Sequence, residues 1–251
     1  MKRVVNFIPN TITSLNLFFG CIAVAIAFSD APMNAGYFIL FAAIFDFFDG
    51  LAARALNARS AFGVQLDSLA DLVSFGVAPA ILIHQLLIMS LTFQSERATF
   101  AVERSSFAEN LILYSAFLIP VFSALRLARF NLKPENNNTF EGLTTTANGI
   151  FIASFAIFFK NLENENIQAF VLNPFVLSGF IILACILLVS KIPMISLKFR
   201  DYNFKKNKLR YFILLISLIF IILFRIPGIA LSIVCYVMIS VVNSWFLKPE
   251  Q

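Results

Sequence analysis

Eight apolar runs separated by polar breaks constrain this chain more than any other feature of its sequence. They cover approximately residues 13–29, 35–56, 66–93, 107–129, 147–161, 168–190, 209–225 and 228–247. A helix of about 20 residues crosses the apolar layer of a bilayer, so only the run at 147–161 is short for a span. Because lipid offers no partner for backbone N–H and C=O groups, each run should form a helix. The sequence therefore predicts an all-α membrane protein, a polytopic bundle of about eight transmembrane helices.

Composition agrees with this fold class. Hydrophobic residues make up 59% of the chain and charged residues 13%, with a net charge of +5, whereas soluble domains carry roughly 25% charged residues. The basic residues lie at the ends of the apolar runs and form no separate patch or tail, so we expect no nucleic-acid partner.

The basic residues also predict the orientation in the membrane. With a cytoplasmic N-terminus and eight crossings, 15 of the 19 lysines and arginines fall on the cytoplasmic side. Cytoplasmic loops are the ones enriched in Lys and Arg. We therefore expect both termini to be cytoplasmic.

The first apolar run resembles a signal peptide, because Lys2 and Arg3 precede it. However, Asn10, Thr13 and Asn16 recur at three-residue steps and share one helix face. A cleaved leader has no need of such a face. We therefore interpret this run as a retained helix.

Four aspartates stand out in this apolar background. Asp46 and Asp49 lie at the end of the second run, and Asp67 and Asp71 lie at the start of the third. Spacings of three and four residues place each pair on one helix face. The short connection makes the two helices antiparallel neighbours, so the pairs are expected to face each other at the cytoplasmic boundary.

Carboxylates gathered in this way repel one another unless they are protonated, paired with bases or bound to cations. Oxygen ligands without His or Cys favour a hard ion such as Mg²⁺ or Mn²⁺. Four carboxylates suit two ions better than one, and paired ions recur in enzymes of phosphoryl transfer. The small residues between the pairs, Gly50, Ala52, Ala53 and Gly63, would admit a ligand or a neighbouring helix.

The pattern Asp46-x2-Asp49-Gly50-x2-Ala53-Arg54-x8-Gly63-x3-Asp67-x3-Asp71 resembles the full signature of the CDP-alcohol phosphatidyltransferases. The resemblance implies metal-dependent displacement of CMP from a CDP-activated lipid by an alcohol. It makes Asp46, Asp49, Asp67 and Asp71 metal ligands, with Asp71 also the base for the alcohol. It places Gly50 and Arg54 against the CDP group, and we expect Gly63, Thr13 and Asn16 to line the same pocket.

The rest of the chain narrows the acceptor. The stretches "IPNTITSLNLFFG", "DSLADLVSFGVAPA", "ALRLARFN" and "VSKIPMISLK" are similar to the phosphatidylserine synthase branch, with CDP-diacylglycerol and L-serine as substrates. Thr144 departs from that branch, which usually has proline there. Arg126 and Arg129 are candidates for binding the serine carboxylate or a lipid phosphate, and Ser74 and Asn131 are weaker candidates for the same role.

The resemblance also implies the organisation of the chain. Residues 1–251 form one membrane domain, with a cytoplasmic segment at 1–12, a catalytic six-helix core at 13–190 and two additional helices at 209–247. The expected location is a bacterial inner membrane, among lipids, with the active site facing the cytoplasm. Members of the family are often homodimers, although no motif here demands one.

Three alternatives stay open. The same chemistry could use glycerol 3-phosphate, inositol phosphate or choline as acceptor. Intramembrane prenyltransferases also use aspartate-rich metal motifs, but the Gly-x2-Ala-Arg-x8-Gly spacing counts against them. A cation transporter could use the carboxylates as its ion site, but transporters commonly show internal repeats and none is visible here.

Overall fold

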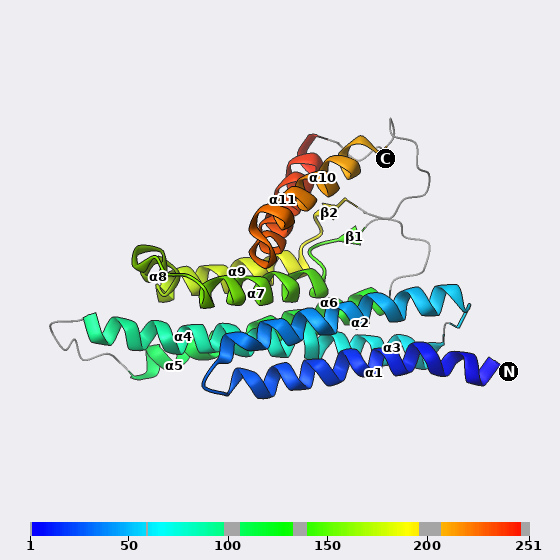
Figure 1. Cartoon of the computed structure of the whole chain (residues 1–251), viewed down its shortest axis with the longest axis horizontal. Helices are drawn as coiled ribbons and strands as arrows, with labels where there is room; N and C mark the ends of the chain where they lie inside the picture. Colours follow the sequence, from blue (N-terminus) through cyan, green and yellow to red (C-terminus); the bar gives the residue numbers. More distant parts are fainter. Residues whose placement is uncertain (1, 59, 98–105, 133–139, 196–206, 247–251) are drawn as a thin grey trace.

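The computed structural model describes residues 2–58, 60–97, 106–132, 140–195 and 207–246 of the chain. Its first layer is made of long helices (Figure 1). In chain order they are α1 (Lys2–Ala27), the 3₁₀ turn η1 (Pro32–Asn34), α2 (Ala35–Ala55), α3 (Ala61–Asp71), η2 (Leu72–Val77), α4 (Ala78–Arg97), α5 (Ser106–Ser115) and α6 (Leu118–Leu132). The segment η2 is a π-helical turn between α3 and α4, and such turns are frequent at functional sites.

The second half of the chain packs on this layer. It contains β1 (Phe140–Glu141), α7 (Thr145–Lys160), α8 (Glu165–Val171), α9 (Pro174–Val189), β2 (Pro193–Met194), α10 (Lys208–Phe224) and α11 (Ile226–Phe246). Helix α7 packs against α2 and η2, and α11 packs against α7 and β2. In Figure 1 the α10–α11 hairpin stands on the side of α7 and α9 that is remote from α1.

Small side chains let the helices approach closely, as is common between membrane helices. Ala23, Ala35 and Ala153 are fully buried in the core. Gly149 of α7 lies so close to Phe75 of η2 that a Cβ atom at residue 149 would overlap the Phe75 backbone. Helix α7 is therefore held directly against the π-helical turn.

The predicted all-α polytopic fold is confirmed in outline. In the described part of the chain, five helical spans are long and apolar enough to cross a membrane, or six if the bent pair α8–α9 is one span. The bend is 55° and coincides with Asn173, whose side chain caps α9, and with Pro174 at the start of α9. Helix α7, at 16 residues, is apolar but shorter.

Two helix boundaries differ from those expected, and one strand pairing was not predicted. Helix α1 begins at Lys2 instead of residue 13, and α3 begins at Ala61 instead of residue 66 because the Ser60 side chain accepts a hydrogen bond from the Gly63 N–H. A short antiparallel ladder also pairs Phe140 with Met194. It ties the chain just before α7 to the segment after α9.

Candidate active site

The aspartates lie in the C-terminal halves of α2 and α3, where three of them converge and Asp71, the last residue of α3, lies beside them. Asp46, Asp49 and Asp67 each offer a carboxylate oxygen, and these oxygens lie within 4.8 Å of one another. Asp49 is 5% exposed, and its Oδ2 atom has no hydrogen-bond partner among the described residues. The expectation that the two pairs face each other therefore agrees with this geometry.

This donor set fits a hard divalent cation. Three converging carboxylates supply only oxygen ligands, which is the preference of Mg²⁺ and Mn²⁺. A buried carboxylate oxygen without a partner is costly unless a cation or a donor reaches it. The residues present are therefore suited to hold the metal, and Asp46, Asp49 and Asp67 would be its first ligands.

Asp71 lies one turn further into the bundle, at the junction of α3 and the π-helical turn. Its side chain is 9% exposed and interacts electrostatically with Asp46, Asp49 and Asp67. Asn16 of α1 is fully buried and directs its Nδ2 atom at Asp71 Oδ1, 3.4 Å away. Ser74 of η2 donates to the Asn16 carbonyl at 3.0 Å. Asn16 of α1 is therefore hydrogen-bonded both to Asp71 and to Ser74, three residues later in the chain.

The residues expected to contact CDP have different surroundings. Gly50 has open space where a Cβ would be, and Arg54 is exposed and donates from Nε to the Gly50 carbonyl at 2.9 Å. Gly63 lies instead against Asn10 of α1. Thr13 is buried and donates to the Pro9 carbonyl at 3.0 Å. Gly50 and Arg54 are thus accessible to a ligand, whereas the Gly63 and Thr13 contacts lie within the protein.

The candidates for acceptor binding also differ among themselves. Arg126 of α6 interacts electrostatically with Asp71 and with Tyr236 of α11. Its Nε atom is buried and has no hydrogen-bond partner within the part of the chain that the structure describes. Arg129 is exposed one turn further along α6. Asn131 donates to the Ser68 hydroxyl at 2.9 Å, and Ser74 is fully buried with its hydroxyl used on α1. Arg126 is therefore the member of this group that interacts electrostatically with Asp71.

The sequence reasoning missed the polar residues at the start of α7. Thr145 and Asn148 are each 1% exposed, and Thr145 Oγ1 and Asn148 Nδ2 have no partner among the described residues. The sequence signal that could have identified them is the presence of polar residues in the first turn of an otherwise apolar helix. Thr144, where the resembling branch usually has proline, caps α7 by accepting a hydrogen bond from the Ala147 N–H at 3.1 Å.

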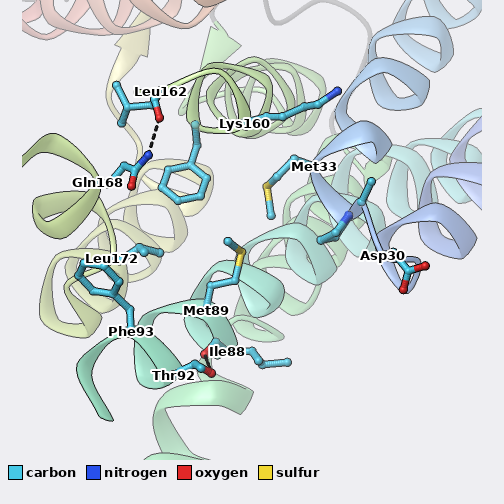
Figure 2. Close-up of a pocket in the computed structure, with 13 residues that line it drawn as sticks. Asp30, Met33, Ile88, Met89, Thr92, Phe93, Lys160, Leu162, Gln168 and Leu172 are labelled. Atoms are coloured by element: carbon cyan, nitrogen blue, oxygen red, sulfur yellow. Dashed lines mark hydrogen bonds between the residues drawn. The ribbon is translucent and has the colours of Figure 1, made fainter. Parts of the chain in front are cut away.

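A separate hollow of about 600 Å³ lies at the opposite end of the bundle, near the α1–α2 connection and the end of α7. Figure 2 shows Met33, Met89 and Phe93 around it, with Asp30 and Lys160 at its edge. Lys160 donates to the Asn34 side chain at 2.7 Å. Because the four aspartates lie on α2 and α3 and none of them lines this hollow, it is distinct from the candidate active site.

Comparisons with known proteins agree with the geometry. The CDP-diacylglycerol–serine O-phosphatidyltransferase of Bacillus subtilis (strain 168) is 31% identical over 187 residues, which cover 74% of this chain and 89% of that protein. The protein of the same name from Helicobacter pylori (strain ATCC 700392 / 26695) is 28% identical, with 96% of this chain and 92% of that protein covered. The archaetidylserine synthase of Methanothermobacter thermautotrophicus is 30% identical, with 68% and 66% covered.

The family model described as CDP-alcohol phosphatidyltransferase matches residues 6–173, which contain all four aspartates. The resemblance read from the sequence is confirmed. The chain belongs to the CDP-alcohol phosphatidyltransferase family.

Proposed function

We propose that this protein transfers the phosphatidyl group of CDP-diacylglycerol to the hydroxyl of L-serine, giving phosphatidylserine and CMP. The observation that carries the proposal is the cluster of Asp46, Asp49 and Asp67 with Asp71 beside it. The serine acceptor is supported by relatives from Bacillus and Helicobacter, whose names specify serine.

In the proposed reaction, the serine oxygen forms a bond to the phosphorus that carries diacylglycerol. The bond from that phosphorus to the CMP oxygen breaks, and CMP leaves with the electron pair. The serine proton passes to a carboxylate oxygen of Asp71. Because an alcohol is a weak nucleophile near pH 7, a positioned base contributes roughly 10²–10⁴-fold to the rate. Asp71 suits this role because it lies beside the metal cluster and is held by Asn16.

We assign two Mg²⁺ or Mn²⁺ ions to the four aspartates. When bound, such ions neutralise the diphosphate and the charge that develops on the departing CMP. Arg54 adds a fixed positive charge beside Gly50, where the open backbone allows CDP to approach closely. Gly63 and Asn16 support this pocket through contacts between α1 and α3, and Thr13 of α1 supports it through its interaction with Asp49 of α2.

On the acceptor side we assign Arg126 as the residue that holds an anionic group of serine or of the lipid. Its unpartnered Nε atom and its interaction with Asp71 support this assignment. Arg129, one turn away, would attract lipid phosphate at the surface. Ser74 and Asn131 act through other residues, because their hydrogen bonds go to Asn16 and Ser68.

We further propose eight transmembrane helices with both termini in the cytoplasm, in the inner membrane of a bacterium. The excess of basic residues on one side supports this orientation. The active site then opens to the cytoplasm, where serine is dissolved, while the acyl chains of the donor stay in the bilayer. A homodimer in the lipid phase is compatible with this arrangement.

The test is CMP release from CDP-diacylglycerol by the purified protein with Mg²⁺ or Mn²⁺ and one acceptor at a time. The acceptors are L-serine, glycerol 3-phosphate, inositol phosphate and choline. We expect CMP release and a new phospholipid when L-serine is the acceptor, and neither product with the other three acceptors. CMP release with glycerol 3-phosphate and none with serine would refute the serine assignment, and no CMP release with any acceptor would refute the enzyme itself.

A further inference from the structure

The buried side-chain polar atoms that lack hydrogen-bond partners among the described residues form one group of acceptors and one group of donors. Seven such side-chain atoms occur in the described part of the chain, and six of them fall into two groups. The two on α1 and α2, Asn16 Oδ1 and Asp49 Oδ2, are acceptors and lie on the side of the metal cluster. The other group consists of four atoms on α6 and α7: Ser123 Oγ, Arg126 Nε, Thr145 Oγ1 and Asn148 Nδ2.

Every atom of this second group can donate a hydrogen bond. Arg126 Nε and the Asn148 amide nitrogen only donate, and the two hydroxyls donate or accept. Ser123 is fully buried, and Thr145 and Asn148 are each 1% exposed. Buried donors without partners are costly, so the presence of four on α6 and α7 indicates an acceptor that the described residues do not supply.

A serine or threonine hydroxyl inside a helix often donates to the carbonyl four residues earlier, but the Thr145 hydroxyl cannot do so. Ser154 of the same helix donates to the Ile150 carbonyl four residues earlier at 2.8 Å. Thr145, as the first residue of α7, has no helical carbonyl four residues before it. The start of α7 also carries the positive end of the helix dipole, which favours an anion.

The π-helical turn packs against both helices that carry the four donors. Ser123 and Arg126 are three residues apart on α6, and Thr145 and Asn148 are three residues apart on α7, so each pair shares a helix face. Ser123 lies against Gly76 of the turn, and Gly149, which follows Asn148, lies against Phe75. Asp71 precedes this turn, and Arg126 interacts with it electrostatically.

We propose that Ser123, Arg126, Thr145 and Asn148 form a pocket for the anionic group of the acceptor, which in serine is the carboxylate. This inference rests on the proposed function and deepens it. The hydroxyl of serine then lies toward Asp71, between the carboxylate pocket on α6 and α7 and the metal cluster on α2 and α3. Thr145 and Asn148 are the residues by which the protein selects an acidic acceptor.

The experiment replaces Thr145 by valine, which removes the hydroxyl and preserves the shape, and separately Asn148 by aspartate, which removes the donor and adds a negative charge. Thr146→Val is the matched control, because it makes the same change at the adjacent, half-buried residue. The KM values for L-serine and for CDP-diacylglycerol and the kcat are measured for each variant. L-Serinamide, which lacks the carboxylate, is the comparison acceptor.

We expect Thr145→Val to raise the KM for serine roughly 10-fold, the cost of one hydrogen bond to a charged group, and Asn148→Asp to raise it further. The KM for CDP-diacylglycerol should stay near the wild-type value, which also reports a folded enzyme. The preference for serine over serinamide should fall in both variants, and Thr146→Val should behave as wild type.

If both variants keep the wild-type KM for serine, the proposal that these residues bind the serine carboxylate is refuted. A raised KM for CDP-diacylglycerol alone would also refute it and would assign the donors to a lipid phosphate. If the wild type uses glycerol 3-phosphate and not serine, the proposed function fails by itself. The pocket is then retained if Thr145→Val raises the KM for that phosphate acceptor, and is refuted if it does not.

Discussion

Replacing Asp71 by asparagine removes the proposed base, while the amide oxygen of asparagine can still serve as a metal ligand. The exchange keeps the shape of a side chain that is 9% exposed. In the wild type Asn16 Nδ2 lies 3.4 Å from Asp71 Oδ1, and the amide oxygen of the new asparagine can accept the same hydrogen bond. The carboxylates of Asp46, Asp49 and Asp67 remain in place. The loss should therefore be that of a general base, about 10²–10⁴-fold in kcat, or about 3–5 kcal/mol at 1.36 kcal/mol per tenfold change.

The assay is initial-rate CMP release at saturating serine, CDP-diacylglycerol and Mg²⁺. Asp30→Asn serves as the control, because Asp30 is an exposed aspartate at the other end of α1. We expect the Mg²⁺ concentration for half-maximal rate to stay largely unchanged in Asp71→Asn. A turnover within a few-fold of the wild type would refute the assignment of Asp71 as the base. A large rise in the Mg²⁺ requirement with normal maximal rate would make it a metal ligand only.

Removing divalent metal with EDTA should abolish CMP release, and adding Mg²⁺ or Mn²⁺ should restore it; activity that survives EDTA would contradict the metal assignment. Gly149→Ala should lower the Tm in detergent, because its Cβ would meet the Phe75 backbone and overpacking costs about 1–3 kcal/mol. Gly179→Ala, with open space at that position inside α9, should keep or raise the Tm because alanine favours the helix, and a Tm of Gly149→Ala equal to that of Gly179→Ala would contradict the packing argument. Thr144→Ala should destabilise the protein by about 1 kcal/mol through loss of the α7 cap, measured as a lower Tm that Thr144→Ser does not show.

The aspartate pairs could be placed from the sequence because their geometry is local. Helical spacing puts Asp46 with Asp49 and Asp67 with Asp71, and the short connection brings the pairs together. The oxygens within 4.8 Å follow from these two facts. The apolar runs likewise predicted most helices, because burial in lipid and backbone pairing act on each run separately.

Features that depend on contacts between distant segments were not predictable in this way. The π-helical turn at Leu72–Val77 is packed between Asn16, Ser123 and Gly149, and its own sequence reads as ordinary apolar helix. The bend between α8 and α9 has a local cause in the sequence, an N-capping Asn173 followed by Pro174. We did not predict it because the run at 168–190 is apolar throughout and predicts one helix. The roles of Thr145 and Asn148 depend on which helix faces them, which periodicity cannot tell.

The basic sequence of residues 198–210 predicts a solvated loop that attracts anionic lipid. Residues 198–206 lie outside the described residues, and Lys208 begins α10, so residues 208–210 are helical.

The most direct test of the account follows the serine oxygen. The purified protein is given CDP-diacylglycerol, Mg²⁺ and L-serine labelled with ¹⁸O in its hydroxyl, and the products are analysed by mass spectrometry. The account predicts phosphatidylserine that retains the ¹⁸O label and CMP that carries none, because the serine oxygen attacks phosphorus and the CMP oxygen leaves. Unlabelled phosphatidylserine, or ¹⁸O in CMP, would contradict it.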